Sequence, residues 1–276
     1  MILSGKELAA RIEIELQKQI ATSKITPCIA VILVGSDPAS EIYITRKRAA
    51  AERVGAQFEL HHETNATTES LIVLMQSLNA RPDVHGILMQ LPLPPGFDTD
   101  KIINAMDPAK DVDGFHPENI AAFMEDRPQA HLPVLLRAVQ LLLAETKTPV
   151  EGKHAVIVGK SDVFLYPMTH LLELLGLTVT WVKPERIAEQ EQTQRADVLI
   201  VAVGIPGIIT ADKIKPGAII IDIGINRTAE GKVVGDVDYE NCAPLASWIT
   251  PTPGGVGPVT IASVFLSLTQ LAQDAQ

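Results

Sequence analysis

The chain has 276 residues, of which 46% are hydrophobic, and its formal net charge is −10 at pH 7. This length suits one large or two ordinary α/β domains, and the acidic balance argues against a general role in binding nucleic acid or a membrane surface. No apolar run approaches the roughly 18 to 20 residues that cross a bilayer, and the first residues lack the layout of a signal peptide, so we expect a soluble, cytoplasmic protein.

The first half of the chain alternates predicted strands and helices. A helix over residues 4–22 carries Leu8, Ile12 and Leu16 at helical spacing. Strand 29–34 ends in a turn, and Pro38 suits the first position of a helix capped by Asp37. Further along come strand 57–61, helix 67–78 and strand 86–89, which the proline-rich run 90–95 ends. This alternation predicts a mostly parallel sheet with right-handed crossovers.

A second α/β series begins near residue 150, after a predicted helix over 135–145. Its predicted strands are 155–158, 178–182, 198–203, 218–223 and 247–250. A final helix over 259–271 follows the Pro/Gly-rich loop 250–258. The chain is therefore predicted to form two α/β domains with a cleft between them, the second one Rossmann-like.

The pattern Ser40-x-x-Tyr43-x-x-x-Lys47 is the most informative feature of the first series. The spacing i, i+3, i+7 puts these side chains on one helical stripe that Ala50 and Val54 continue, so Lys47 lies on an inward face. A lysine beside a phenol on such a face can have a lowered pKa and transfer protons. The alternative is a lysine that extends past a core tyrosine to reach solvent.

Metal and disulfide chemistry have little support in the sequence. Cys28 and Cys242 lie far apart and are predicted to be buried free thiols. No His-x-x-x-His pair or Cys/His cluster occurs among the seven histidines, so we expect no metal site. Asp111-Val-Asp113-Gly114 lacks the remaining ligands of a calcium loop, and Asp113 is instead a candidate ligand anchor or a turn residue.

A dinucleotide signal follows strand 155–158. Gly159-Lys160-Ser161 resembles a Rossmann phosphate turn, but only the first glycine of the fingerprint is present and residues 164–166 are bulky. Near the end of strand 178–182, Glu185 is surrounded by the positive charges of Lys160, Lys183 and Arg186. These charges would bind the 2′-phosphate of NADP and therefore favour NADP over NAD. The alternative is a Rossmann-like domain that no longer binds its cofactor.

Taken together, these motifs resemble the bifunctional methylenetetrahydrofolate dehydrogenase/methenyltetrahydrofolate cyclohydrolase family over nearly the full length. The blocks that carry the resemblance are residues 34–47, 86–94, 111–117, 221–226, 235–238 and 251–258. The resemblance implies a folate-binding catalytic domain over residues 1–128, with helix 259–276 packed back on it, and a Rossmann-like NAD(P)-binding domain over residues 129–258. It also implies tetrahydrofolate derivatives as substrates in one-carbon metabolism, and a homodimer.

The resemblance also assigns roles in the folate site. Lys47 would be the general acid/base of cyclohydrolysis, Gln90 would hydrogen-bond Lys47, and Tyr43 would stack on the substrate. Asp113 would anchor the pterin ring, and Ser40 would orient the residues of the catalytic helix. The substrate site would be completed by Leu91, Pro253, Gly254, Gly255 and Val256.

For the cofactor, the resemblance implies NADP, with NAD as the alternative. The residues that fit a dinucleotide site are Gly159, Lys160, Ser161, Gly204, Gly224, Ile225, Asn226 and Thr260. The chain departs from the family pattern at Val134, Phe164, Leu165 and the segment 183–186. Two hypotheses follow: a bifunctional NADP-dependent enzyme with an altered cofactor pocket, or a cyclohydrolase-only or non-catalytic folate-binding relative that has lost hydride transfer.

Overall fold

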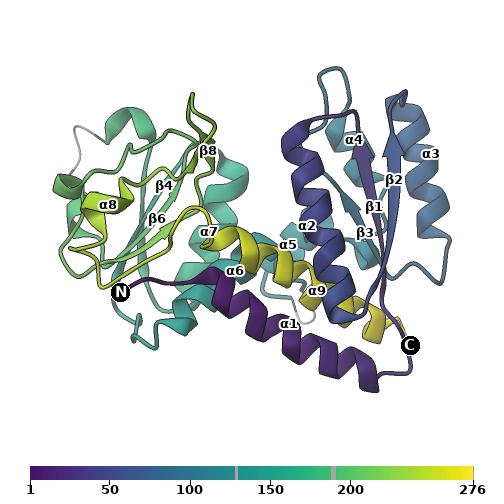
Figure 1. Ribbon diagram of the computed structural model, residues 1–276, viewed down its shortest axis with the longest axis horizontal. Helices are drawn as coiled ribbons and strands as arrows, with labels where there is room; N and C mark the ends of the chain where they lie inside the picture. The colour runs from purple at the N-terminus through teal and green to yellow at the C-terminus, as the bar shows by residue number, and fades with distance from the viewer. Residues whose placement is uncertain (128–129, 188–190, 276) are drawn as a thin grey trace. The chain divides into compact units, whose positions relative to one another are not determined.

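The computed structural model describes residues 1–127, 130–187 and 191–275, and the chain divides into two compact units (Figure 1). The three-stranded unit comprises Ala10–Leu135 and Ile261–Gln276, and the five-stranded unit comprises Met1–Ala9 and Leu136–Thr260. The predicted domain boundary at 128 and 129 lies outside the described residues, as does position 276. The predicted α/β class with a Rossmann-like second unit is confirmed.

The three-stranded unit is built on a parallel sheet with the order β2-β1-β3. Strand β1 (Cys28–Val34) is central and buried along its whole length, with β2 (Gln57–Glu63) and β3 (Gly86–Met89) on either side. Because β1 is covered on both faces, it is a continuous apolar run rather than an alternating one. The middle strand thus contributes side chains to a hydrophobic core on each face of the sheet.

Helices cover both faces of this sheet. Side chains of α1 (Gly5–Thr22), α2 (Pro38–Val54) and α9 (Val256–Asp274) pack with the odd-numbered residues of β1. Those of α3 (Thr68–Asn79) and α4 (Thr99–Asn104) pack with its even-numbered residues. The 3₁₀ turn η1 (Pro108–Lys110) and helix α5 (Pro117–Met124) follow in the chain.

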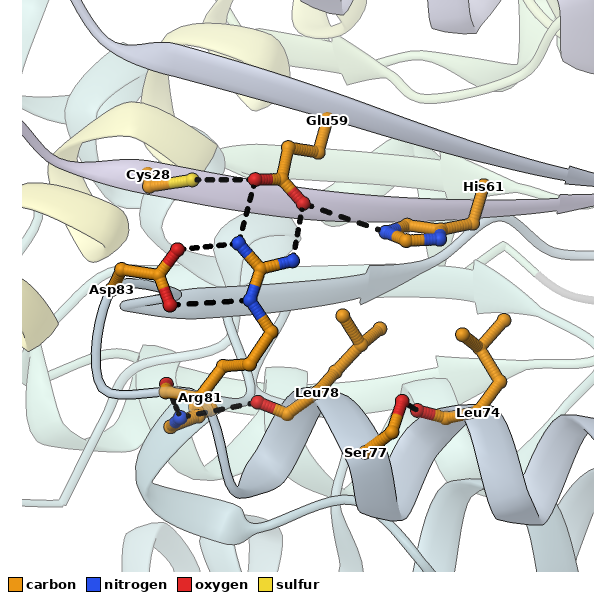
Figure 2. A network of polar contacts seen from close by, with 9 residues as sticks. Cys28, Glu59, His61, Leu74, Ser77, Leu78, Arg81 and Asp83 are labelled. Atoms are coloured by element: carbon orange, nitrogen blue, oxygen red, sulfur yellow. Dashed lines mark hydrogen bonds and ion pairs between the residues drawn. The ribbon is translucent and has the colours of Figure 1, made fainter.

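Strand β2 lies at an edge of the sheet and carries polar side chains. Figure 2 shows Arg81 between Glu59 and Asp83, with Cys28 and His61 beside Glu59. Arg81 donates two hydrogen bonds to the Glu59 carboxylate, at 2.7 and 2.8 Å, and also pairs with Asp83. Charged side chains on an edge strand discourage pairing with another chain, so this network suits the position of β2.

The five-stranded unit contains a parallel sheet with the order β10-β7-β6-β4-β5. Its strands are β4 (His154–Gly159), β5 (Thr178–Val182), β6 (Val198–Ala202), β7 (Ile219–Asp222) and β10 (Trp248–Ile249). Strands β8 (Asn226–Arg227) and β9 (Val233–Val234) form an antiparallel hairpin. The helices are α6 (Val134–Glu145), α7 (Asp162–Leu174), α8 (Tyr239–Cys242) and the 3₁₀ turns η2 (Pro184–Arg186), η3 (Thr193–Arg195) and η4 (Ala211–Lys213).

The first residues of the chain belong to the five-stranded unit, although the sequence analysis expects them in the first domain. Ile2 forms a parallel bridge with Ile249 of β10. The Leu3 N–H donates to the Ile249 carbonyl at 2.8 Å, and the Ile249 N–H donates to the Met1 carbonyl at 3.1 Å. The N-terminal segment therefore continues the pairing beyond β10.

The helices differ from the sequence-based expectation in two ways: α9 begins earlier, and no helix is predicted at α4, α5, α7 or α8. Helix α9 begins at Val256, three residues before the predicted start, so part of the predicted glycine-rich loop forms its first turn. By length and composition α9 is the one helix in the described chain that could cross a membrane, but 67% of its most apolar window is buried. At α7 the sequence analysis notes only that residues 164–166 are bulky where a phosphate turn has small residues, and it predicts no helix there.

Candidate functional site

Lys47 lies on the buried side of α2, as its stripe predicts. The Asp37 carboxylate caps the helix by accepting from the Ser40 N–H at 2.8 Å, and Pro38 occupies the first turn. Two turns along, Lys47 is 9% exposed and donates from Nζ to Oε1 of Gln90 at 3.0 Å. The structure thus brings together two predicted site residues from distant parts of the sequence.

Gln90 is held by bonds on both its backbone and its side chain. Its N–H donates to the Ile32 carbonyl at 2.9 Å, which extends the pairing of β3 with β1 by one residue. Its Nε2 donates to the Leu91 carbonyl at 2.8 Å, so Oε1 is the atom left to face Lys47. The fixed amide gives Lys47 a neutral acceptor in place of a carboxylate.

Burial has opposite effects on the two titratable groups of this site. It lowers the pKa of Lys47, although the charge of Asp113 opposes that change. It also raises the pKa of Asp113 to about 6, an effect that Lys47 opposes and Asp111 reinforces. Both shifts favour the neutral form, because a charged group loses hydration when it is buried. A buried amine whose pKa is lowered is a better proton acceptor than an ordinary lysine.

Asp113 sits on a loop that Asp111 organises. The buried Asp111 carboxylate accepts from the N–H groups of Gly114 at 3.0 Å and His116 at 2.7 Å, and from Asn119 Nδ2 at 3.0 Å. Gly114 has φ of +75° and lies against Pro133, so a side chain there would be strained and crowded. The loop that carries Asp113 is therefore rigidly defined.

The remaining residues of the predicted folate site have less specific contacts. Tyr43 is half-buried, with the Arg46 guanidinium 6.0 Å from its ring centroid, and burial raises the pKa of its phenol. The Ser40 hydroxyl donates to Asp37 at 2.9 Å, so it reinforces the helix cap. Leu91 is partly exposed beside Gln90.

Pro253, Gly254, Gly255 and Val256 belong to the five-stranded unit, whereas Lys47 belongs to the three-stranded unit. Their segment is held within its own unit, because the Lys6 N–H donates to the Gly254 carbonyl at 2.9 Å. Gly254 has φ of +108°, a conformation that favours glycine.

The cofactor residues gather at the carboxyl edge of the five-stranded sheet. β4, the first strand of this sheet in the chain, pairs with β5 on one side and β6 on the other, so the order reverses there and a ligand is expected at the ends of β4 and β6. Gly159 ends β4, Lys160 and Ser161 are exposed, and α7 begins at once. Ser161 makes no side-chain cap bond, which leaves the N-terminus of α7 open to a phosphate.

The bulky residues after β4 are arranged differently from the sequence-based expectation. Leu165 is 1% exposed, and it contacts the place where a side chain on Gly159 would begin, at 3.0 Å. Its side chain is therefore packed in the core of the five-stranded unit. Val134, another of the positions that depart from the family pattern, is likewise buried in the core of its own unit. The described residues at this edge fit a dinucleotide phosphate group.

The other cofactor residues lie on neighbouring loops. Gly204 follows β6 and Gly224 follows β7, Ile225 is exposed, and Thr260 donates to the Val256 carbonyl within α9 at 3.2 Å. Asn226 donates from Nδ2 to Oδ1 of Asp236 at 2.8 Å. Asp222 and Asp236 lie within the family motifs 221–226 and 235–238, but no sequence pattern predicts a role for either side chain.

Fold and site together define a class of protein: an α/β enzyme with a buried lysine and carboxyl group in one unit and a dinucleotide-type sheet in the other. Residues 3–113 match the catalytic domain, and residues 133–276 the NAD(P)-binding domain, of tetrahydrofolate dehydrogenase/cyclohydrolase. A bifunctional protein FolD of Acetivibrio thermocellus is 44% identical over 276 residues, which cover 99% of this chain and 96% of that protein.

Solved structures agree with the sequence matches. The bifunctional enzyme FolD of Campylobacter jejuni superposes with a TM-score of 0.95 at 39% identity, covering 100% of this chain and 99% of that one. The Trypanosoma brucei enzyme complexed with NADP cofactor and inhibitor gives 0.93 at 29% identity, covering 99% and 97%. The chain belongs to the tetrahydrofolate dehydrogenase/cyclohydrolase family, which confirms the resemblance seen in the sequence.

Proposed function

We propose that this chain oxidises 5,10-methylenetetrahydrofolate to 5,10-methenyltetrahydrofolate with NADP and hydrolyses the product to 10-formyltetrahydrofolate. Family membership supports both activities. The observation that carries the residue assignment is the buried hydrogen bond from Lys47 Nζ to Gln90 Oε1 at 3.0 Å.

Hydrolysis needs a group that removes a proton from the attacking water. Water adds to the electron-poor methenyl carbon and releases one proton. The bond from that carbon to N5 then breaks as the remaining hydroxyl proton moves to N5, which leaves the formyl group on N10. Lys47 is suited to accept the proton because its burial favours the neutral amine. Gln90 directs the amine, and Asp113 is placed to hold the pterin ring by hydrogen bonds.

When bound, NADP supplies the acceptor for the hydride that leaves the methylene carbon. The contribution of this chain to that step is position and charge. Gly159, Ser161 and the N-terminus of α7 would receive the diphosphate, because unpaired helix N–H groups attract phosphate oxygens. Lys160 and Lys183 are exposed at the ends of the adjacent strands β4 and β5, where a 2′-phosphate would be recognised.

Replacing Lys47 by methionine tests the hydrolytic assignment. The methionine keeps a long apolar stem but cannot accept a proton, so cyclohydrolase kcat should fall by about 10² to 10⁴. Folate binding, measured by calorimetry with a substrate analogue, should be retained. Arg46→Met, next to it on α2, is the matched control. Hydrolysis by Lys47→Met at the wild-type rate would contradict the role of Lys47.

Calorimetry with NADP and NAD tests the cofactor assignment. We expect wild-type protein to prefer NADP and Lys183→Ala to lose about tenfold in NADP affinity with little change for NAD, because a charge-assisted contact to the 2′-phosphate is removed. Lys232→Ala, an exposed lysine of the hairpin, should behave as wild type. Equal binding of the two nucleotides by wild type would contradict NADP preference. The homodimer and the cytoplasmic location are proposed on the family resemblance, and light scattering and cell fractionation test them.

A further inference from the structure

Asp236 is buried completely, yet it lies directly beneath two cofactor loops of the five-stranded unit. Its Oδ2 accepts from the N–H groups of Val203 at 2.7 Å and Gly204 at 2.9 Å. Its Oδ1 accepts from the Ile205 N–H at 2.9 Å and from Asn226 Nδ2 at 2.8 Å. One carboxylate thus holds three consecutive backbone amides of the loop after β6 and the side chain that follows β7.

Asp222, at the end of β7, holds Asp236 in turn. Its Oδ1 accepts from the Asp236 N–H at 3.1 Å and the Gly224 N–H at 2.9 Å, and its Oδ2 accepts from the Val237 N–H at 3.0 Å. Its own N–H donates to the Thr250 hydroxyl at 2.8 Å. The two carboxylates form a buried chain that links the ends of β6, β7 and β10.

The linked pair Asp236 and Asp222 lies at the edge of the sheet where a nucleotide is expected to bind. Ligands of such sheets bind outside the carboxyl ends of the strands, on the loops that follow them. Gly204 and Asn226 are two of the residues assigned to the cofactor, and both are bonded to Asp236. Because Asp236 has no exposed surface, it can act on a nucleotide only through those loops.

We propose that Asp236 is a positioning residue for the nucleotide, which fixes the loops after β6 and β7 in the geometry that binds NADP, with Asp222 as its support. This inference rests on the proposed dehydrogenase function. It assigns no role to Asp236 in hydrolysis, because every contact that it makes lies in the five-stranded unit.

The test is Asp236→Asn in the full-length protein. The asparagine offers one acceptor oxygen, so its NH₂ group must face donors that the carboxylate now satisfies. We expect the KM and the Kd for NADP to rise by about tenfold to a hundredfold, since unsatisfied buried donors are costly. The KM for the folate substrate and the cyclohydrolase rate, measured without nucleotide, should stay within about twofold of wild type.

Asp238→Asn is the matched control. It removes the same charge two residues along the chain, and Asp238 accepts from Asn241 Nδ2 rather than from the cofactor loops. It should leave the KM for NADP at the wild-type value. Asp222→Asn is the second variant: it should raise that KM by a smaller factor, and it carries the test alone if Asp236→Asn does not fold.

The outcomes are distinct. An unchanged KM for NADP in Asp236→Asn, or in Asp222→Asn where only that variant folds, overturns the inference while the proposed function stands. A parallel loss of cyclohydrolase and dehydrogenase overturns it too, because it indicates a purely structural role. If wild-type protein hydrolyses methenyltetrahydrofolate but binds neither NADP nor NAD, the dehydrogenase half of the proposed function fails, and the inference fails with it.

Discussion

The two units surround their buried charged groups in opposite ways. In the three-stranded unit, Lys47 donates to one acceptor among the described residues, the neutral amide of Gln90. In the five-stranded unit, Asp236 accepts four hydrogen bonds, and Asp222 accepts three. Burial favours the neutral form of Lys47 in the first arrangement and of Asp222 in the second.

The difference matches two kinds of task. A group that transfers protons must have free hydrogen-bonding capacity when the substrate and water arrive, and its pKa must lie near the working pH. A group that fixes a loop is most effective when every lone pair is used, because each unpaired buried donor or acceptor costs about 1 to 3 kcal/mol. Incomplete pairing around Lys47 therefore suits its proposed proton transfer, and complete pairing around Asp236 suits its proposed positioning role.

Gly235→Ala tests the hydrogen-bonded pair Asp222 and Asp236 most directly. A methyl group there would overlap Oδ2 of Asp222 and lie 2.7 Å from its Cγ, and Asp222 cannot move without breaking its backbone bonds. We expect a loss of more than about 3 kcal/mol in the free energy of unfolding, measured by urea titration. Gly257→Ala, with no atom within 4 Å, should be neutral or slightly stabilising. Equal stability of the two variants would contradict the crowding argument.

The contribution of Asp222 to stability should be visible in the pH dependence of the free energy of unfolding. Burial raises the pKa of Asp222 to about 7 from 3.8, so its proton is held more tightly in the folded state. The resulting stabilisation is full below the unfolded pKa and is lost as the pH rises through about 7. Between about pH 5 and pH 8, deprotonation of Asp222 alone should lower the free energy of unfolding by roughly 3 kcal/mol.

Asp222→Asn removes that titration, so the urea midpoint of the variant should fall less than that of wild type over the same pH range. Asp238→Asn is the control, because it changes the net charge of the protein by the same amount. A variant whose pH profile parallels wild type would mean that Asp222 does not titrate in this range.

Asp111→Asn extends the comparison to the other unit. Asp111 is a saturated carboxylate like Asp236, but the loop that it fixes carries Asp113. We expect a loss of about 2 kcal/mol in stability and a higher KM for methenyltetrahydrofolate, with the KM for NADP unchanged. Cyclohydrolase assays measure this, with exposed Asp100→Asn as control. An altered KM for NADP would contradict the prediction that the loop around Asp113 affects folate binding only.

The smallest effect should come from the polar network of Figure 2. Arg81 makes four hydrogen bonds, as many as Asp236, but its side chain is 35% exposed and that of Asp83 is 64% exposed. Exposed ion pairs contribute little, so Arg81→Ala should lower the urea midpoint only slightly, and less still at high salt. Urea titrations at low and high salt measure this. A larger, salt-independent loss would show that the number of contacts matters more than their burial.

Much of the fold follows from the sequence because buried parallel strands are short, continuous apolar runs. The predicted strand 29–34 matches β1 within one residue, and 178–182 matches β5. Helix α7 was missed because residues 164–166 were interpreted only as an altered phosphate-binding segment. In the structure Pro167, Met168 and Leu171 are all buried, and their packing outweighs the proline.

The site was predictable to different degrees. The stripe of Ser40, Tyr43 and Lys47 is a local pattern, and the burial of Lys47 follows from it. The partnership of Lys47 with Gln90 came from the family resemblance, because no periodicity relates residues on different elements. The role of Asp236 was missed for a similar reason: its partners are backbone amides of residues 203–205, which carry no signature in their side chains.

The division of the chain also constrains how this protein can be made. The core of the three-stranded unit contains Phe265 and Leu268 of α9, and the five-stranded unit pairs Leu3 with Ile249. Synthesis proceeds from the N-terminus, and domains made of one continuous segment can fold as they emerge from the ribosome. Here each unit combines an early and a late segment of the sequence, so neither can finish folding before residue 260 or later has been translated.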